Sequence, residues 1–481
     1  MLEIRFGTDG WRAVIGEAFT FHNVKRVAQA VCTLLREKET GGKRHGRQTI
    51  LVGHDWRFMS ERFAASAAGV MSANGFKTRT LSHPATSPML SFAVHRMKAR
   101  LGIMITASHN PPHFNGFKLK DSYGGPMDDN FIREVEQMIG HDPVPPGSET
   151  PQETEVIKSY GGHLARQVDL GRLKSSKIKI AIDCMHGPSA AVVDHLFGNP
   201  AAQLTLLRRG RDPFFGGVNP EPIEKNLALL QKTVPESHCA VGLAFDGDAD
   251  RLGVVDEKGR YLPPHVVFPL LLLHAIENRK WKGKVVETVS MGYLPERIAR
   301  HYGIPFQEVP VGFKYVSHLM RREPVIAGGG EESGGYGFGR CGAERDGILC
   351  GLLLLEYIIT QRRPLSRLVD DLAARFGKSR FSRWDFRADR PVSDRAAWTE
   401  SISKKISHSK SGRKIKNINA LDGLKITLED GSWLLLRPSG TEPLIRLYSE
   451  APELSQVQKL LQWGEEACGF GSVKRERPTK K

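Results

Sequence analysis

Short β-rich runs alternate with amphipathic helical stretches through the first three quarters of this 481-residue chain. Alternation of this kind is typical of α/β units with largely parallel strands. A chain of this length also exceeds what one hydrophobic core supports, so it predicts three or four domains. From about residue 377 the pattern changes to strands that enclose a turn and end in a helix. This change indicates a smaller α+β domain with an antiparallel sheet.

The individual segments suggest where the domains begin and end. The α/β part contains predicted strands at 49–53, 101–105, 177–183, 203–207, 240–245, 284–289 and 325–327, and predicted helices at 60–73, after Pro188 and from Asp346. The last part contains predicted strands at 433–437 and 444–450 and a helix at 453–467. We therefore expect three similar mixed α/β sandwich domains at 1–150, 151–258 and 259–376, a C-terminal α+β domain at 377–471 and a basic tail at 472–481. A Pro-, Gly- and acid-rich stretch at 140–155 is the expected first linker.

The net charge of +16 (pI ≈ 9.6) favours an anionic partner, which leaves nucleic acid, a membrane surface or a phosphorylated metabolite open. Local basic runs at 404–416 and 474–481 are typical of solvated surface. The chain has no aromatic-stacking or groove-reading motif, so we expect no nucleic-acid partner. The apolar runs at 266–276 and 348–359 are too short to span a membrane and are predicted to be buried helices.

Cysteine usage and the start of the chain bear on location. The six cysteines are widely spaced and form no CxxC pair, which predicts reduced thiols. No basic segment followed by an apolar stretch stands at the start, so we expect no signal peptide. Both features predict a cytoplasmic protein.

A polar loop directly follows a hydrophobic strand in each α/β block. Ligands of open α/β sheets bind at the carboxyl ends of strands, so these loops are expected to converge on one central cleft. The first loop, residues 106–118, reads TASHNPPHFNGFK. Its Asn-Pro-Pro sequence disfavours a helix after Ser108 and holds that hydroxyl on a rigid, exposed turn beside His109 and Lys118. Ser108 is a candidate nucleophile, and a plain turn capped by Ser and Asn is the alternative.

The second loop, residues 246–251, reads DGDADR. Asp246, Asp248 and Asp250 offer the hard oxygen ligands that Mg²⁺ and Ca²⁺ require, and they would repel one another without a cation. An EF-hand is disfavoured because Arg251 stands where the sharp turn of that loop needs Gly, and because the flanking residues alternate as strands do. The loop predicts a divalent-metal site.

The third loop, residues 328–335, reads GGGEESGG. Glu331 and Ser333 between glycines suit the hydroxyl groups of a polyol. A phosphate-binding loop is the alternative, but no GK[ST] sequence follows and the paired acids would repel phosphate.

The fourth loop, residues 437–446, reads RPSGTEPLIR. Two arginines, two hydroxyls and the free backbone N–H groups around a glycine form an anion-binding nest, and a plain hairpin turn is the alternative. The candidate phosphate ligands are Arg437, Ser439, Gly440, Thr441 and Arg446. A nucleophile, a metal loop, a polyol loop and a phosphate loop together indicate phosphoryl transfer on a phosphosugar.

Along essentially its whole length the sequence resembles the α-D-phosphohexomutases. The matching motifs are FGTDGWR at 6–12, the phosphoserine loop at 106–110, the metal loop at 246–251, the sugar-specificity loop at 331–334 and the phosphate loop at 437–441. The resemblance implies four domains around a central cleft. It also implies a Mg²⁺ ion bound by the three aspartates and by the phosphate on Ser108, with glucose 1,6-bisphosphate as intermediate and activator. Arg12 is expected to steady the first-domain loop and to assist substrate binding.

The resemblance also bears on the base and the substrate. Candidates for the general base are His109, Lys118 and Lys314. Gly335 stands where dual mannose/glucose members usually carry His, and glucosamine members usually carry Gln as the second residue of the sugar loop. VGFKY, which contains Lys314, resembles the lysine-bearing segment of glucose-preferring members. A glucose-preferring mutase with mannose as a second substrate, monomeric or homodimeric, is therefore expected. Phosphoglucosamine mutase and a non-catalytic sugar-phosphate-binding protein are the alternatives.

Overall fold

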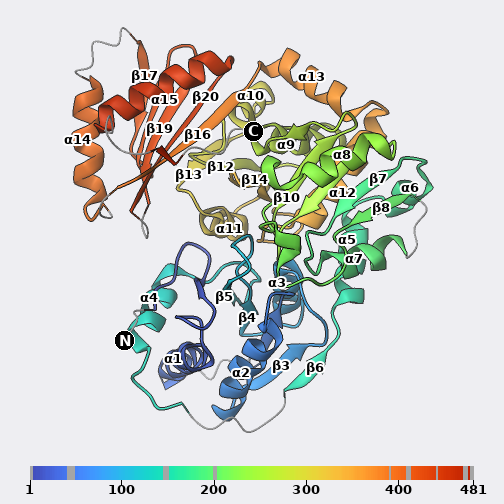
Figure 1. The fold of residues 1–481 in the computed structure, drawn as a ribbon, viewed down its shortest axis with the longest axis vertical. Coiled ribbons are helices and arrows are strands. Elements are labelled where there is room, and N and C mark those ends of the chain that lie inside the picture. Colours follow the sequence, from blue (N-terminus) through green and yellow to red (C-terminus); the bar gives the residue numbers. More distant parts are fainter. Residues whose placement is uncertain are drawn as a thin grey trace.

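Four β-sheets follow one another along the chain (Figure 1). The computed structural model describes residues 4–40, 49–144, 151–198, 203–388, 392–407, 413–439, 443–469 and 475–476. Three sheets mix parallel and antiparallel strands, and the fourth is antiparallel throughout its described pairs. The predicted fold class, three similar mixed α/β domains followed by a smaller α+β domain, is confirmed.

The first three sheets repeat one four-stranded unit. In each, the first strand pairs in parallel with the second and the third, and the fourth strand runs antiparallel beside the third. The strands are β2 (Thr49–His54), β3 (Lys77–Leu81), β4 (Leu101–Ile105) and β5 (Phe114–Asp121); β7 (Ile180–Asp183), β8 (Leu204–Leu207), β9 (Val241–Phe245) and β10 (Leu252–Asp256); and β12 (Lys284–Thr288), β13 (Phe306–Val309), β14 (Val325–Glu331) and β15 (Gly335–Gly337). The three predicted blocks thus have one shared topology.

Helices make the crossovers that parallel neighbours require. They are α2 (Ser60–Ala73) and α3 (Ser87–Arg96) in the first unit, α7 (Ser189–Phe197) and α8 (Ala228–Glu236) in the second, and α10 (Leu294–His301) and α11 (Phe313–Arg322) in the third. Local sequence fixes their ends: Thr86 caps α3 by accepting a hydrogen bond from Met89 N, and Pro88 occupies its first turn. Helices cover both faces of the central strands, which is why every residue of β4 and β9 is buried.

Further elements surround the three units. The first sheet gains β1 (Trp11–Val14) and β6 (Gln152–Thr154), and the second gains β11 (Tyr261–Leu262). The added helices are α1 (Phe21–Thr40), α4 (Asp129–Met138), α5 (Ile157–Gln167), α6 (Leu170–Ser175), α9 (Pro264–Leu273) with a π-helical turn at His274–Asn278, α12 (Gly347–Gln361) and α13 (Leu365–Phe376). Because β6 pairs with β3, the first sheet extends past the expected domain boundary at residue 150.

The last domain is an antiparallel sheet with two helices. Its strands are β16 (Arg380–Arg387), β17 (Ile415–Asn419), β18 (Leu424–Leu428), β19 (Trp433–Pro438), β20 (Leu444–Ala451) and β21 (Arg475–Glu476), and its helices are α14 (Arg395–Ser407) and α15 (Leu454–Cys468). Of the expected basic tail at 472–481, only 475–476 lie within the described residues.

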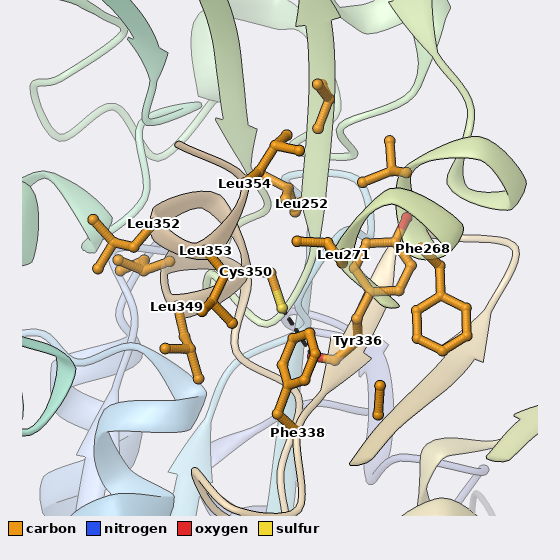
Figure 2. Packing of buried hydrophobic residues seen from close by; sticks show 14 of the residues in the cluster. Leu252, Phe268, Leu271, Tyr336, Phe338, Leu349, Cys350, Leu352, Leu353 and Leu354 are labelled. Carbon is orange, nitrogen blue, oxygen red and sulfur yellow. Dashed lines mark hydrogen bonds between the residues drawn. The ribbon is translucent and has the colours of Figure 1, made fainter. Parts of the chain in front are cut away.

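One hydrophobic cluster runs across the first three domains and reaches the fourth, from Leu51 to Tyr448. Its centre is formed by α9 and α12, the two apolar runs that were predicted to be buried helices. Figure 2 shows leucines of α12 together with Phe268 and Leu271 of α9 in this cluster, and Phe268 stacks on Tyr336 with the ring centroids 5.7 Å apart. Domain boundaries are therefore not core boundaries. Within the described part of the chain no helix is long and apolar enough to cross a membrane, and all six cysteines are free thiols.

Candidate active site

The three polar loops of the α/β domains occupy one equivalent position. Each connects the third strand of its unit to the antiparallel fourth strand: β4 to β5, β9 to β10, and β14 to β15. The first two loops meet directly, because the Ser108 hydroxyl donates a hydrogen bond to Asp246 Oδ2 at 2.7 Å. The second and third loops are joined by Leu252 N, which donates to Gly334 O at 2.9 Å.

Ser108 is fully buried in the structure, whereas the sequence predicted an exposed turn. The prediction treated the first loop alone, and the metal loop of the next domain covers it. Ser108 adopts a left-handed backbone conformation (φ 51°), which is strained for a residue with a side chain. Such strain persists only where the surrounding structure imposes it.

Arg57 imposes that conformation. Its guanidinium is fully buried and donates to four backbone carbonyls of the serine loop, those of Ser108 (2.7 Å), Asn110 (2.6 Å), Pro111 (2.9 Å) and Phe114 (3.1 Å). The loop conformation is thereby fixed before any ligand binds.

The three aspartates of the metal loop lie together and are completely buried. One oxygen of each falls within 4.8 Å of those of the other two. Burial raises the pKa of Asp246 well above its usual range, and the neighbouring carboxylates Asp248 and Asp250 raise it further. Burial also opposes ionisation of Asp248, but the Lys118 ammonium outweighs that effect and holds its pKa below the ordinary value.

The triad fits a divalent cation. Asp248 Oδ1 and Asp250 Oδ1 are buried carboxylate oxygens without a hydrogen-bond partner. Buried polar atoms are normally satisfied, so two such oxygens in one cluster call for a ligand that supplies positive charge. Oxygen-only ligation of this kind suits Mg²⁺ or Ca²⁺.

Lys118 and Arg345 surround the remaining carboxylate oxygens. Lys118 Nζ lies 2.8 Å from Asp248, 3.3 Å from Asp250 and 2.8 Å from Asp9. Arg345 Nη2 lies 2.6 Å from Asp250 and 2.8 Å from Asp9. Burial opposes the Lys118 charge, yet the three carboxylates outweigh burial and raise its pKa. Segments from all three α/β domains thus share one buried charge network.

Gly247 allows the first two loops to approach each other. A Cβ atom at this position would lie well inside 3.0 Å of the Ser108 carbonyl oxygen, a distance that real Cβ atoms essentially never show. The glycine between the first two aspartates therefore sets the separation between the serine and the metal loop.

Of the other predicted residues, His109 and Arg12 lie at the serine loop and Lys314 does not. His109 Nδ1 lies 3.4 Å from Ser108 Oγ. Burial lowers the pKa of His109 well below its usual range, and nearby cations, Arg251 first, lower it further. Arg12 Nη1 donates to Asn110 Oδ1 at 2.7 Å, so Arg12 lies against the serine loop. Lys314 lies elsewhere: its Nζ forms an ion pair with Asp129 of α4 at 2.8 Å.

The sugar-specificity loop packs against its neighbours through two glycines. A Cβ on Gly334 would lie 2.6 Å from Leu252 O, and one on Gly335 would lie 2.5 Å from Arg345 Cδ. The Arg345 side chain thus fills the space that a side chain at 335 would need. Ser333 is partly buried, and the side chain of Glu331 lies outside the described residues. Glu332, which was not among the predicted site residues, accepts a hydrogen bond from Ser290 at 2.8 Å and lies 3.4 Å from Arg383.

The phosphate loop connects β19 to β20. Arg437 and Arg446 are directly opposed across these antiparallel strands, so their side chains share one face of the sheet. Like charges in this arrangement repel each other, which favours an anion close to them. Arg437 Nε donates to Asp422 at 2.8 Å, and Ser439 is buried. Gly440 and Thr441 lie outside the described residues.

Besides Glu332, four residues of the site were missed by the sequence analysis. Asp9, Arg57, Arg345 and Arg383 lie in segments that were not read as polar loops. Arg57 carried a usable signal, because it follows the predicted strand at 49–53 just as Ser108 follows its own strand. No sequence signal pointed to Arg345, because it comes close to Asp250 only when the domains pack together.

Comparison with known proteins agrees with this geometry. Family models for α/β/α domains I, II and III and for the C-terminal domain of phosphoglucomutase/phosphomannomutase match residues 3–143, 158–259, 263–376 and 395–462. These matches show that the chain is an enzyme of the phosphomutase class, that is, an isomerase that works by phosphoryl transfer. It belongs to the phosphoglucomutase/phosphomannomutase family, within the α-D-phosphohexomutases.

Individual relatives cover nearly the whole chain. A probable phosphoglucosamine mutase of Methanopyrus kandleri is 29% identical over 95% of each chain. A phosphoglucomutase/phosphomannomutase of Thermococcus kodakarensis is 28% identical over 95% of this chain and 97% of its own. The crystal structure of a putative phosphomannomutase from Thermus thermophilus superimposes with a TM-score of 0.83 at 31% identity, covering 96% of this chain and 98% of that one. The curated relatives thus carry more than one substrate name.

Proposed function

We propose that this protein interconverts hexose 1-phosphates and hexose 6-phosphates through a phosphoserine at Ser108. The observation that carries the proposal is the buried contact of Ser108 Oγ with Asp246 Oδ2 at 2.7 Å, beside two carboxylate oxygens without a hydrogen-bond partner. A phosphoryl group on Ser108 would stand directly against the cation that these carboxylates are suited to hold.

Each half of the reaction exchanges one P–O bond for another. The phosphoryl group leaves Ser108 Oγ and joins O6 of a hexose 1-phosphate, while the O6 proton passes to a base. The resulting 1,6-bisphosphate turns over within the site, the phosphoryl group on O1 passes back to Ser108 Oγ, and the base returns its proton to O1. Asp246, Asp248 and Asp250 would hold Mg²⁺, which would neutralise charge on the transferring phosphoryl group. Glucose 1,6-bisphosphate would phosphorylate Ser108 and so activate the enzyme.

Among the three candidate bases, the contacts favour His109. Its ring nitrogen lies 3.4 Å from Ser108 Oγ, and its lowered pKa leaves it neutral and able to accept a proton at pH 7. Lys118 is held protonated by three carboxylates, and Lys314 is paired with Asp129. A His109→Gln variant should lose about 10²–10⁴-fold in kcat. In the wild type the rate should fall at low pH as the base becomes protonated. The His109→Gln variant should lack this fall, whereas a Lys314→Gln variant should keep it.

The remaining phosphate of the substrate would bind between Arg437 and Arg446. Their directly opposed positions favour a doubly charged anion there, and Ser439 supplies a further donor. Both orientations of the bisphosphate can use this site, because it binds the phosphate rather than the sugar.

For the substrate we propose glucose 1-phosphate, with mannose 1-phosphate second. Support comes from Glu332: its carboxylate is already paired with Arg383 and accepts a hydrogen bond from Ser290, so it is less available to the ammonium of a glucosamine. Phosphoglucosamine mutase is the competing assignment, because the Methanopyrus kandleri relative carries that name.

The test measures kcat/KM with glucose, mannose and glucosamine 1-phosphates for the wild type and for Ser108→Ala. We expect the highest value with glucose 1-phosphate and no turnover by the variant. A higher value with glucosamine 1-phosphate would reverse the substrate assignment and leave the mutase activity intact. Intact mass without phosphate on Ser108 after incubation with glucose 1,6-bisphosphate would instead indicate a non-catalytic sugar-phosphate-binding protein.

A further inference from the structure

A cavity separate from the candidate active site lies where the first three domains meet. It has a volume of about 900 Å³, which is within the usual size range of small-molecule sites. Its walls come from α3, the turn after β5, α5, the end of α11 and the segment 339–346. Neither Ser108 nor the aspartate triad lines it.

The rim of this cavity is strongly basic. Five permanently charged side chains line it and are exposed, and none of them takes part in an ion pair within the described part of the chain; they are Arg96, Lys98, Arg166, Arg321 and Arg340. Charges of one sign around a concave surface add up to a strong local potential that attracts counter-ions. The cavity is therefore suited to an anion with several charges.

The two acids of the cavity wall do not offset this charge. Glu344 is buried and accepts from Ser91 at 3.2 Å, and Lys120 neutralises it through an ion pair. Asp346 is also buried, where it caps α12 at Leu349 N (2.9 Å) and accepts from the Tyr160 hydroxyl at 2.7 Å. Both carboxylates are thus occupied by internal partners.

One wall is aromatic. Phe92 of α3 lies 4.9 Å from the ring of His163 and 5.7 Å from that of Tyr160, both on α5. His163 Nε2 contacts Cys341 O at 3.1 Å, which joins this wall to the segment 339–346. Flat side chains beside a basic rim suit a molecule that has an organic ring as well as phosphate groups.

We infer that this cavity is a binding site for a compact organic polyphosphate, separate from the phosphate loop of the active site. Its ligand bridges three domains. Arg345, next to the cavity residue Glu344, contacts Asp250 and Asp9 in the reaction centre. Binding therefore fixes the segment that carries Arg345, which gives the site a route to the catalytic centre. The inference goes beyond the proposed function and does not depend on which hexose phosphate is the substrate.

Calorimetric titration of the full-length protein tests the site with two probes, inorganic tripolyphosphate and ATP, both without Mg²⁺. All titrations use an Arg437→Gln/Arg446→Gln background, so that the phosphate loop cannot contribute. The test variant adds Arg166→Gln/Arg321→Gln/Arg340→Gln. The control variant adds Arg62→Gln/Arg133→Gln/Arg367→Gln, three exposed arginines outside the cavity, and so removes the same charge.

We expect one equivalent of each probe to bind, with ATP the tighter ligand because it has a ring. The affinity should fall at least tenfold in the test variant and stay within twofold in the control. Hydrogen exchange should slow in peptides that cover 339–346 when ATP is added. Absence of binding, equal losses in both variants or tripolyphosphate binding as tightly as ATP would each overturn the inference. Melting temperatures close to the parent value establish that both variants are folded.

Discussion

Replacing Gly247 with Ala probes the contact between the serine loop and the metal loop. The added methyl group is the smallest possible change, and it points at the Ser108 carbonyl oxygen. The backbone at Gly247 is outside the left-handed region, so Ala adds no backbone strain there. The substitution therefore reports the separation of the two loops and little else.

The expected size of the effect follows from the geometry. The methyl carbon would stand well inside the 3.0 Å limit for such contacts, so the loops must separate by roughly half an ångström or more. Arg57 resists any shift of the serine loop, because it donates to four of its carbonyls. A misplacement of about 1 Å at a reacting group costs about 10²-fold in rate. We therefore expect a loss of about 10- to 100-fold in kcat for Gly247→Ala.

The assay is mutase turnover at saturating Mg²⁺ and glucose 1,6-bisphosphate, with intact mass to record phosphate on the serine. The matched control is Gly69→Ala in the middle of α2, where an added Cβ would meet nothing within 4 Å. That control should keep full activity and gain up to about 1 kcal/mol in stability, because Ala favours helix over Gly.

A kcat for Gly247→Ala within twofold of the Gly69→Ala control, with both proteins folded, would refute a role of Gly247 in positioning the two loops. A lower melting temperature alone does not support this role, because misplaced reacting groups reduce the rate without unfolding the protein. Loss of rate with a normal melting temperature is the distinguishing result.

Four further results are expected. Mg²⁺ at 100 times its Kd should stabilise the wild type by about 2.7 kcal/mol in thermal unfolding, and Asp250→Asn should abolish this gain. Burial raises the pKa of Glu450 to about 7 from 4.5. Its contribution to the free energy of unfolding is therefore full below pH 4.5 and is lost as the pH rises through 7. Urea titrations should show that the wild type loses on the order of 3 kcal/mol of unfolding free energy relative to Glu450→Gln over that range. Arg446→Ala should reduce kcat/KM by about 10- to 150-fold, as expected for one charged hydrogen bond to phosphate. Arg57→Met should cost about 3–5 kcal/mol in chemical denaturation, because it leaves Asp55 buried without its cationic partner, and Arg57→Lys should recover only part of that.

Much of the fold could be predicted from the sequence because apolar residues repeat with a different period in strands than in helices. The helix Ser60–Ala73 and the strand Leu101–Ile105 begin and end where the pattern indicates. The strand predicted at 177–183 begins only at Ile180, because pairing with Leu204 starts there. The partners of a strand come from distant segments of the chain. The local sequence pattern therefore predicts that an element exists better than it predicts where the element begins and ends.

The site was predictable where chemistry is confined to one loop. Ser108 and the aspartate triad each lie within a few residues and follow a strand, so their clustering follows from topology. The burial of Ser108 and the role of Arg345 depend on how separate domains pack. Contacts of this kind leave no local sequence pattern, and they were missed for that reason.

The shared topology of the three α/β units has a consequence for how such an enzyme can diversify. In each unit the last parallel strand is connected to its antiparallel neighbour by a polar loop. This connection carries the proposed nucleophile in one copy, the proposed cation ligands in the next and the proposed sugar-binding residues in the third. Because each copy has its own strands to support that connection, residues in one can be exchanged while the other two keep their chemistry. Substrate preference can then drift along a lineage without disturbing the machinery of phosphoryl transfer.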